Sequence, residues 1–220
     1  MGKPGTTRPR RDTYHHGDLR SALITAGLDL ATDGGPEALS LREVARRAGV
    51  SPTAAYRHFD NRDALLWAIN LAVLARLGAA LRAATRSRLP SRLDDAERAR
   101  RRLVDIGQAY VDFAVTNPGQ YRVIFAEATF PDSGPLGLDP ECDPYGILGE
   151  VLDQMEAAGA LAPGRRQGAE VPMWALVHGL SSLILEGPYR RLSRREQVAL
   201  VQSANELVVS GLQDGGRPQS

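Results

Sequence analysis

The sequence has a single cysteine, Cys142, and almost no net charge. One cysteine excludes a disulfide framework within the chain and a CxxC metal knuckle, and it is typical of a protein from a reducing cytoplasm. Lys and Arg number 27 and Asp and Glu number 26, which excludes a histone-like polycation and an acidic chaperone-like chain. A local basic patch is still compatible with this composition, because net charge does not describe how charges are distributed.

The sequence also lacks the features of targeting and membrane segments. The first residues, 1–4, contain no apolar core, so we expect no signal peptide. The most apolar stretch, residues 65–81, is interrupted by Asn70 and Arg76, and we expect it to fall short of a membrane span. The sequence therefore favours a cytoplasmic protein without a membrane partner.

Signatures of several enzyme classes are missing. The sequence contains no G-x-S-x-G, H-E-x-x-H, Walker or G-x-G-x-x-G motif, and it has only four histidines. His15 and His16 lie beside Asp18, but adjacent histidines diverge and one aspartate does not complete a coordination shell. We expect no metal, no cofactor and no enzymatic activity.

Helical periodicity is present along most of the chain, and no segment alternates convincingly with period two. A chain of 220 residues is long enough for one or two domains with a substantial core. The sequence predicts an all-α fold, with a loop over residues 131–144, which are rich in proline and acidic residues. The predicted helices cover residues 18–33, 41–48, 53–59, 62–86, 103–116, 118–125, 147–157, 174–185 and 194–212.

The segment from residue 40 to residue 59 carries the most informative pattern. Ser40 and Glu43 form a potential capping box at the start of the first short helix, and Gly49 provides the turn after it. Ser51 and Pro52 are typical of the start of a second short helix. This spacing is that of a helix-turn-helix, whose second helix enters the major groove of DNA, and equally that of an ordinary helical hairpin.

If the segment binds DNA, its second helix provides side chains suited to that surface. Ala55 and Phe59 face inward in this pattern. Short side chains such as Thr53 and Ala54 can approach bases, and Tyr56, His58 and Arg62 can reach phosphates. The predicted outward residues are Thr53, Ala54, Tyr56, Arg57 and His58.

These residues resemble a known family. Residues 41–66 are similar to the DNA-binding core of the tetracycline-repressor (TetR) family, including a Tyr-x-His-Phe element that ends at Phe59. Residues 14–20 resemble the opening of one branch of that family, and Trp174 with His178-Gly179 resembles the C-terminal signature of the same branch.

The resemblance implies a homodimeric, ligand-responsive transcription regulator, usually a repressor at the bacterial nucleoid. Each subunit would place one recognition helix on a palindromic operator, and Ser40 and Arg42 would lie near the DNA backbone. Effector binding would tilt the linking helix over residues 62–86, and the last two helices would form a four-helix dimer interface. The implied organisation is a flexible basic arm (1–13), a helix-turn-helix domain (14–61), an effector-binding and dimerisation domain (62–213) and a disordered tail (214–220).

Two sets of residues are candidates within the second domain. Residues that could line an effector pocket could equally form the core, and the polar ring of His178 needs either a ligand or a neighbouring residue as its partner. The pocket candidates are Tyr110, Phe113, Tyr121, Phe125, Met155, Trp174 and His178. The candidates for the dimer interface are Leu180, Ile184, Val201, Ala204 and Val208.

Some alternatives stay open at this level. The basic arm over residues 3–11 could follow DNA or remain a solvated tail, and the arginines within 98–102 are most simply a solvated helix face. A DNA-binding regulator without a small-molecule effector is the main alternative function. A small helical enzyme is the least favoured one.

Overall fold

The computed structural model describes residues 16–126 and 137–213, and these residues form helices, turns and connecting segments without any strand. The all-α prediction is confirmed. The predicted arm (1–13) and tail (214–220) lie outside the described residues. The elements are α1 (His16–Gly34), η1 (Gly35–Ala38), α2 (Leu41–Arg47), α3 (Pro52–Tyr56), α4 (Arg62–Thr85), α5 (Asp95–Thr116), α6 (Pro118–Ile124), η2 (Pro140–Cys142), α7 (Pro144–Ala157), α8 (Glu170–Leu185) and α9 (Arg194–Gln213).

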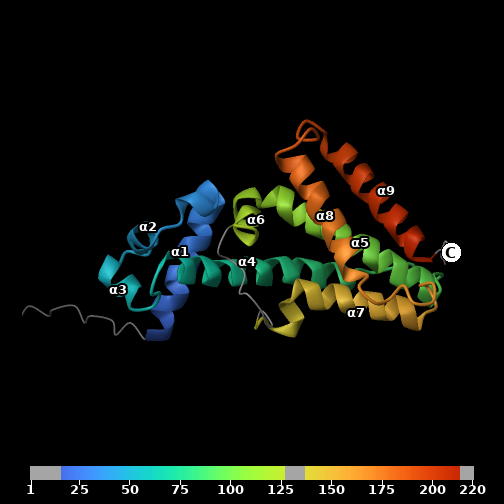
Figure 1. The fold of residues 1–220 in the computed structure, drawn as a ribbon, viewed down its shortest axis with the longest axis horizontal. Coiled ribbons are helices and arrows are strands. Elements are labelled where there is room, and N and C mark those ends of the chain that lie inside the picture. Colours follow the sequence, from blue (N-terminus) through green and yellow to red (C-terminus); the bar gives the residue numbers. More distant parts are fainter. Residues whose placement is uncertain (1–15, 127–136, 214–220) are drawn as a thin grey trace, which may run out of the picture.

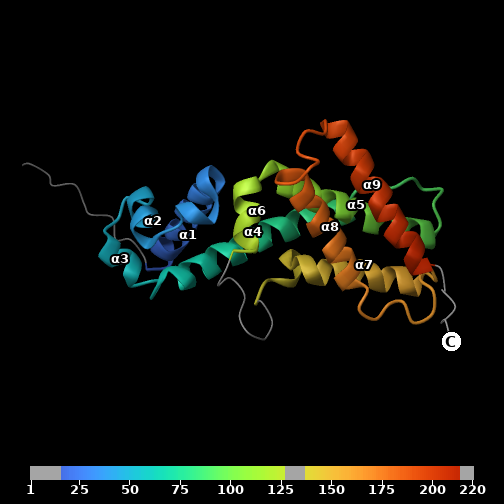
Figure 2. The ribbon, with the colours of Figure 1, turned by 45° about the horizontal axis from the view of Figure 1, so that its top comes forward.

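The molecule is elongated, with α1–α3 at one end and α5 and α7–α9 at the other (Figures 1 and 2). The long helix α4 runs between the two groups. It packs against α1 in the first group and against α5 and α7 in the second. Helix α4 therefore connects the two parts of the molecule physically.

Side-chain caps explain where several helices begin. The Asn61 side chain accepts a hydrogen bond from the Ala64 amide at 2.8 Å, which starts α4. Asp94 forms a capping box with Glu97 at the start of α5. Ser193 and Glu196 form a second capping box at the start of α9, because the Glu196 carboxylate accepts from the Ser193 amide and the Ser193 hydroxyl accepts from the Glu196 amide. These polar contacts fix helix starts that apolar periodicity alone does not locate.

Two predicted caps differ from the structure. The Ser40 hydroxyl accepts from the Glu43 amide, but the Glu43 carboxylate pairs with Arg46 instead of returning to Ser40. Asn117 makes no side-chain cap for α6; its amide group donates to the Phe113 carbonyl at 3.1 Å. In both positions the side chain forms a hydrogen bond with a residue about one helical turn away, and this bond replaces the predicted cap.

The proline-rich loop is shorter than predicted. Within its described part, residues 140–142 form the short helix η2, and α7 begins at Pro144. Proline is favoured in the first turn of a helix because its missing N–H has no partner there anyway. The Asp143 carboxylate accepts from the Tyr145 amide at 3.0 Å and completes this helix start.

Helix α4 is long and apolar enough to cross a membrane by length and composition, so the expectation of a shortfall was wrong. Its side chains nevertheless belong to the core of a folded domain, since 56% of its most apolar window is buried. Leu65, Ile69, Val73 and Leu77 on this helix are fully buried. An apolar all-round helix of this kind is typical of the centre of a helical protein.

Helix α6 brings the second group of helices into contact with the first. At Gly119 a side chain would lie 2.1 Å from the Ala31 carbonyl oxygen, so only glycine allows α6 to approach α1 this closely. The buried amide of Gln120 donates to the Thr32 hydroxyl at 2.8 Å and accepts from Arg76 of α4 at 3.3 Å. Helices α1, α4 and α6 are therefore joined by one polar network.

Candidate functional site

Helices α2 and α3 form the expected helix-turn-helix. Gly49 adopts a positive φ of 71°, and the Val50 amide donates to the Ala45 carbonyl at 2.9 Å, which ends α2. The Ser51 hydroxyl accepts from the Ala54 amide at 3.2 Å and starts α3. Ala55 is fully buried, as the inward-facing pattern predicted. The chain thus places two short helices at a fixed angle on the core of the first group.

Helix α3 is shorter than the sequence suggested. It ends at Tyr56, whereas the predicted helix continued to Phe59. The His58 amide donates to the Ala55 carbonyl at 3.0 Å, so Arg57 and His58 lie in a tight turn after the helix. Phe59 is buried and anchors this turn. Arg57 and His58 therefore belong to the edge of the candidate surface.

The predicted DNA-facing side chains are largely accessible. Three of them are exposed: Thr53, Arg57 and Tyr56, and 51% of the Tyr56 surface is accessible. Ala54 and His58 are half-buried. An exposed aromatic side chain with a hydroxyl group is unusual for a solvated face, and it is suited to contact a polar partner. The surface of α3 thus combines short side chains with one projecting phenol.

The arginines of the helix-turn-helix are of two kinds, those that form ion pairs and those that do not. Arg46 pairs with Glu43, and Arg47 pairs with Asp33 at 3.0 Å. Arg42, at the exposed start of α2, makes no ion pair with any other described residue, and the same holds for Arg57. Together with Ser40, whose O–H is available to donate, these unpaired guanidinium groups suit phosphate oxygens.

Arg62 has a role that the sequence did not indicate. Its Nε donates to the Leu39 carbonyl at 2.9 Å, and its terminal nitrogen donates to the Pro36 carbonyl at 3.0 Å. A guanidinium group has five N–H donors, so others are left over for a phosphate. The first role of Arg62 in this structure is to hold the start of α4 against the segment between α1 and α2.

The pocket candidates separate into two places. Tyr110 and Trp174 line an apolar cavity of about 20 Å³ between α5 and α8, which is room for about one water molecule. The Tyr110 hydroxyl is buried and makes no hydrogen bond of good geometry, although it interacts with the Tyr121 hydroxyl. Burial raises the pKa of Tyr110, so the phenol stays protonated. A buried hydroxyl without a well-formed hydrogen bond is costly and suits a polar atom of a ligand or a water.

The second place is an open pocket of about 310 Å³ beside η1, α6 and α8, lined in part by Tyr121, Phe125 and His178. His178 Nδ1 lies 2.6 Å from the Tyr121 hydroxyl, so a neighbouring residue satisfies the ring, which was one of the two alternatives. The Phe125 ring lies 3.9 Å from the imidazole centre. Burial lowers the pKa of His178 and favours the neutral ring. Phe113 and the fully buried Met155 line neither place.

Comparison with known sequences identifies the family. The pattern of the bacterial regulatory proteins of the tetR family matches residues 23–69, and that of the tetracyclin repressor-like C-terminal domain matches residues 103–206. The chain belongs to the TetR family. The two matches coincide with the helix-turn-helix region and with the second group of helices.

Relatives agree with this assignment. An HTH-type transcriptional repressor from Mycobacterium tuberculosis is 34% identical over 97 residues, covering 44% of this chain and 48% of the relative. The aligned part thus spans about half the length of the curated relatives. A protein of unknown function from Rhodococcus sp. RHA1 is 27% identical with a TM-score of 0.72, covering 93% of this chain and all of that chain. The relatives with a stated function are regulators, in agreement with the expectation that the protein is not an enzyme.

The fold is also that of a TetR variant from Acinetobacter baumannii solved in complex with minocycline. That structure has a TM-score of 0.60 and is 20% identical, covering 94% of this chain and all of that chain. At this identity the likeness shows the shared fold of the TetR-family chains.

The predicted dimer residues of this TetR-family chain do not form an accessible surface. Leu180 and Ile184 on α8 and Val201 on α9 are buried in the core of the single chain, and Ala204 and Val208 are half-buried. Both helices are apolar on two faces, and the face that carries these three buried residues packs on α5. Their outer faces instead expose Val171, Leu183 and Leu207.

Sequence reasoning also missed two buried polar residues at contacts between helices. Gln120 lies in the polar network between α1 and α4, and Asn205 on α9 is fully buried against Gly107 of α5. Both are polar residues within helices, where periodicity gives no reason to single them out. A buried amide is recognised only once its packing partners are known.

Proposed function

We propose that the protein is a homodimeric, ligand-responsive transcriptional repressor that binds a palindromic operator in the cytoplasm. The observation that carries the proposal is the exposed face of α3, where Thr53 and Tyr56 project from a helix-turn-helix flanked by unpaired Arg42 and Arg57. Thr53 and Ala54 would contact bases, and Ser40, Arg42, Tyr56, Arg57 and His58 would contact phosphates or sugars.

The outer faces of α8 and α9 support the dimer. Leu207 is 75% exposed and Val171 is 62% exposed, which is unfavourable in water unless another surface covers them. A side chain added at Gly179 or at Gly211 would meet no atom within 4 Å, so both positions leave room for a partner helix. Two copies related by a two-fold axis would present both α3 helices to one face of DNA, with half-sites about one helical turn apart.

The effector is proposed to be a small molecule with an apolar or aromatic body. It would enter the space beside Tyr110 and Trp174, where the Tyr110 hydroxyl, which lacks a well-formed hydrogen bond, would donate to it, or the open pocket beside His178. A cavity of about 20 Å³ must expand for this to happen. The small size of the cavity is the specific observation that favours the alternative, a DNA-binding regulator without an effector.

The decisive experiment is binding of the purified protein to its own upstream intergenic DNA, measured by gel shift over a series of salt concentrations. A discrete complex at nanomolar protein that resists competitor DNA is expected. Thr53→Ala should relax discrimination between bases at one operator position by roughly 1–3 kcal/mol. Arg42→Gln should weaken binding to all DNA sequences similarly, and it should lower the salt slope, the slope of log affinity against log salt concentration, by about one. Weak binding that salt abolishes on every fragment would contradict the proposal.

The effector is tested separately by the melting temperature of the protein with a panel of apolar compounds. A compound that raises the melting temperature should also release the DNA. Tyr110→Phe removes only the buried hydroxyl and should reduce the effect of that compound. If no compound changes either quantity, the regulator without an effector is the better description.

A further inference from the structure

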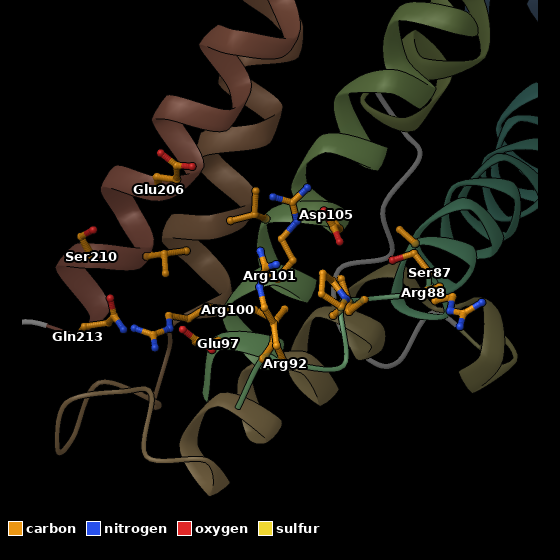
Figure 3. Close-up of a pocket in the computed structure, with 16 residues that line it drawn as sticks. Ser87, Arg88, Arg92, Glu97, Arg100, Arg101, Asp105, Glu206, Ser210 and Gln213 are labelled. Atoms are coloured by element: carbon orange, nitrogen blue, oxygen red, sulfur yellow. Dashed lines mark ion pairs between the residues drawn. The ribbon is translucent and has the colours of Figure 1, made fainter. Parts of the chain in front are cut away.

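A second, larger hollow lies at the end of the molecule far from the helix-turn-helix. It is an open groove of about 900 Å³ between the end of α4, the connection to α5, the first turns of α5 and the end of α9 (Figure 3). This volume is within the range of small-molecule sites. The groove shares no lining residue with the two pockets described above.

The groove gathers arginines. Arg88, Arg92, Arg100 and Arg101 line it, against the three acidic residues Glu97, Asp105 and Glu206. In Figure 3, Arg92 and Arg101 point into the same part of the groove, and Arg100 extends toward Gln213 of α9. Guanidinium groups that face the same space repel one another, and an anion between them relieves this repulsion.

The acidic residues of the groove are already engaged or distant. Asp105 pairs with Arg101 at 3.0 Å, and the Glu97 carboxylate accepts from the Asp94 amide at 3.0 Å in the helix cap. Glu206 lies on α9, well away from Arg92 (Figure 3). Arg92 and Arg100 have no ion pair with any other residue that the structure describes. Arg100 Nε donates to the Ala96 carbonyl at 3.3 Å, so the Arg92 guanidinium and the terminal nitrogens of Arg100 are available to an anion.

The other part of the lining is apolar. Val104 on α5 and Val209 on α9 are buried beneath the groove, and Leu89 and Leu93 are half-buried at its side. An inorganic ion would use the arginines and leave the accessible parts of Leu89 and Leu93 in water. A ligand with an apolar body and an anionic group would use both, with charge-assisted hydrogen bonds at one end and apolar burial at the other.

We propose that the groove binds an amphipathic organic anion, whose carboxylate or phosphate contacts Arg92, with Arg100 adding positive charge on the side of α9, and whose apolar body packs against Leu89 and Leu93. The site is independent of the proposed operator and of the pockets near Tyr110 and His178. It would give this TetR-family chain a second small-molecule input at the end of α4.

The test is calorimetric titration of the full chain with octanoate, octanol and octylammonium, which share one alkyl chain and differ in charge. Octanoate should bind at least tenfold more tightly than the other two, and raising the salt from about 0.05 M to about 0.5 M should weaken it. Octyl phosphate distinguishes a preference for phosphate from one for carboxylate. Equal binding of octanol and octanoate, or no binding of either anion, would overturn the proposal.

Matched variants locate the binding. Arg92→Gln combined with Arg100→Gln should weaken the binding of octanoate at least tenfold. Arg165→Gln removes an exposed arginine outside the groove and should change the affinity for octanoate less than twofold. Ser210→Trp fills the groove from α9 without changing charge and should also block octanoate. Circular dichroism checks that each variant is folded.

The remaining outcomes contradict the assignment. Octanoate binding that persists in both the arginine and the Ser210→Trp variants would place the anion elsewhere in the chain. A change in self-association in these variants, measured by sedimentation and without any anion binding to the parent protein, would make the groove a contact between two copies.

Discussion

The two halves of α4 both bury apolar side chains, but their contacts with neighbouring segments differ. At the N-terminal end, Arg62 donates hydrogen bonds to the carbonyls of Pro36 and Leu39. In the C-terminal half, Arg82 pairs with Glu150, and the backbone at Gly78 lies so close to the Cys142 carbonyl that a side chain would come within 1.9 Å of its oxygen. Water can replace the hydrogen bonds of the exposed Arg62, whereas the close backbone contact at Gly78 leaves no room for water. We therefore expect the C-terminal half to be the fixed end and the N-terminal end, next to the helix-turn-helix, to be the releasable end.

The largest effect is expected from breaking the fixed end. Gly78→Ala places a methyl group against the backbone of η2 and should lower the free energy of unfolding by about 3 kcal/mol. Chemical denaturation measures this loss. Gly149→Ala on α7 is the matched control, because its new side chain would meet only side-chain atoms at 3.6 Å or more and should be neutral or slightly stabilising. Equal stability of the two variants would show that η2 moves aside freely.

The next effect concerns the releasable end. Arg62→Ala removes both carbonyl contacts and should lower the free energy of unfolding by roughly 1–2 kcal/mol. Arg62→Lys keeps the charge but cannot reproduce the two directed bonds, so it should recover only a small part of the loss. Thermal denaturation of both variants measures the difference.

Arg57→Ala provides the contrast to Arg62. Arg57 makes no ion pair with another described residue, so its removal should leave stability within about 0.5 kcal/mol. It should instead lower the salt slope of DNA binding by about one.

A full recovery of stability by Arg62→Lys would mean that charge alone, and not the hydrogen bonds, holds the start of α4.

This contrast also separates what the sequence can and cannot predict. Gly49 and Ala55 were predictable, because the turn and the inward face are set by residues a few positions apart. The partners of Arg62 lie 23 and 26 residues upstream, and Gly78 meets Cys142 across 64 positions. Contacts at such separations depend on how the helices pack, and one sequence without packing information does not show them.

The inward face of α8 was not predictable for a related reason. Helix α8 is apolar on more than one face, and its sequence does not say which face turns inward. Leu180 and Ile184 pack on the core of the chain, and Leu183 is left outside with 40% of its surface exposed. The hydrophobicity of the helix indicates that it needs burial or a partner, but only the position of α5 decides which residues remain for a partner.

A smaller effect is expected at the ion pair of the fixed end. Arg82 bonds to the Glu150 carboxylate and holds the pKa of that group below its ordinary value of 4.5. A lowered pKa stabilises the protein above the ordinary pKa, and this contribution is lost as the pH falls through the lowered value. Because Glu150 is 47% exposed, Glu150→Gln should cost at most about 1 kcal/mol at pH 7 and almost nothing near pH 3. Stability measured at both pH values tests this, and a loss that is the same at both would exclude an electrostatic origin.

The smallest effect links the releasable end to α6, the helix that contacts both α1 and α4. The neutral ring of His178 shares a hydrogen bond with the Tyr121 hydroxyl of α6, and burial lowers the pKa of the ring below 6.5. The stabilisation is therefore complete above pH 6.5 and is lost as the pH falls through the lowered value, because the buried site disfavours the charged ring. We expect the melting temperature to fall by roughly 2 °C more between pH 7.5 and pH 5.5 than in His178→Asn, which keeps an acceptor that does not titrate. His58→Asn is the matched control at a half-buried surface histidine and should retain the parent's pH dependence. If His58→Asn abolishes the difference and His178→Asn does not, the pH response belongs to the helix-turn-helix, and α6 is held to α8 by apolar packing alone.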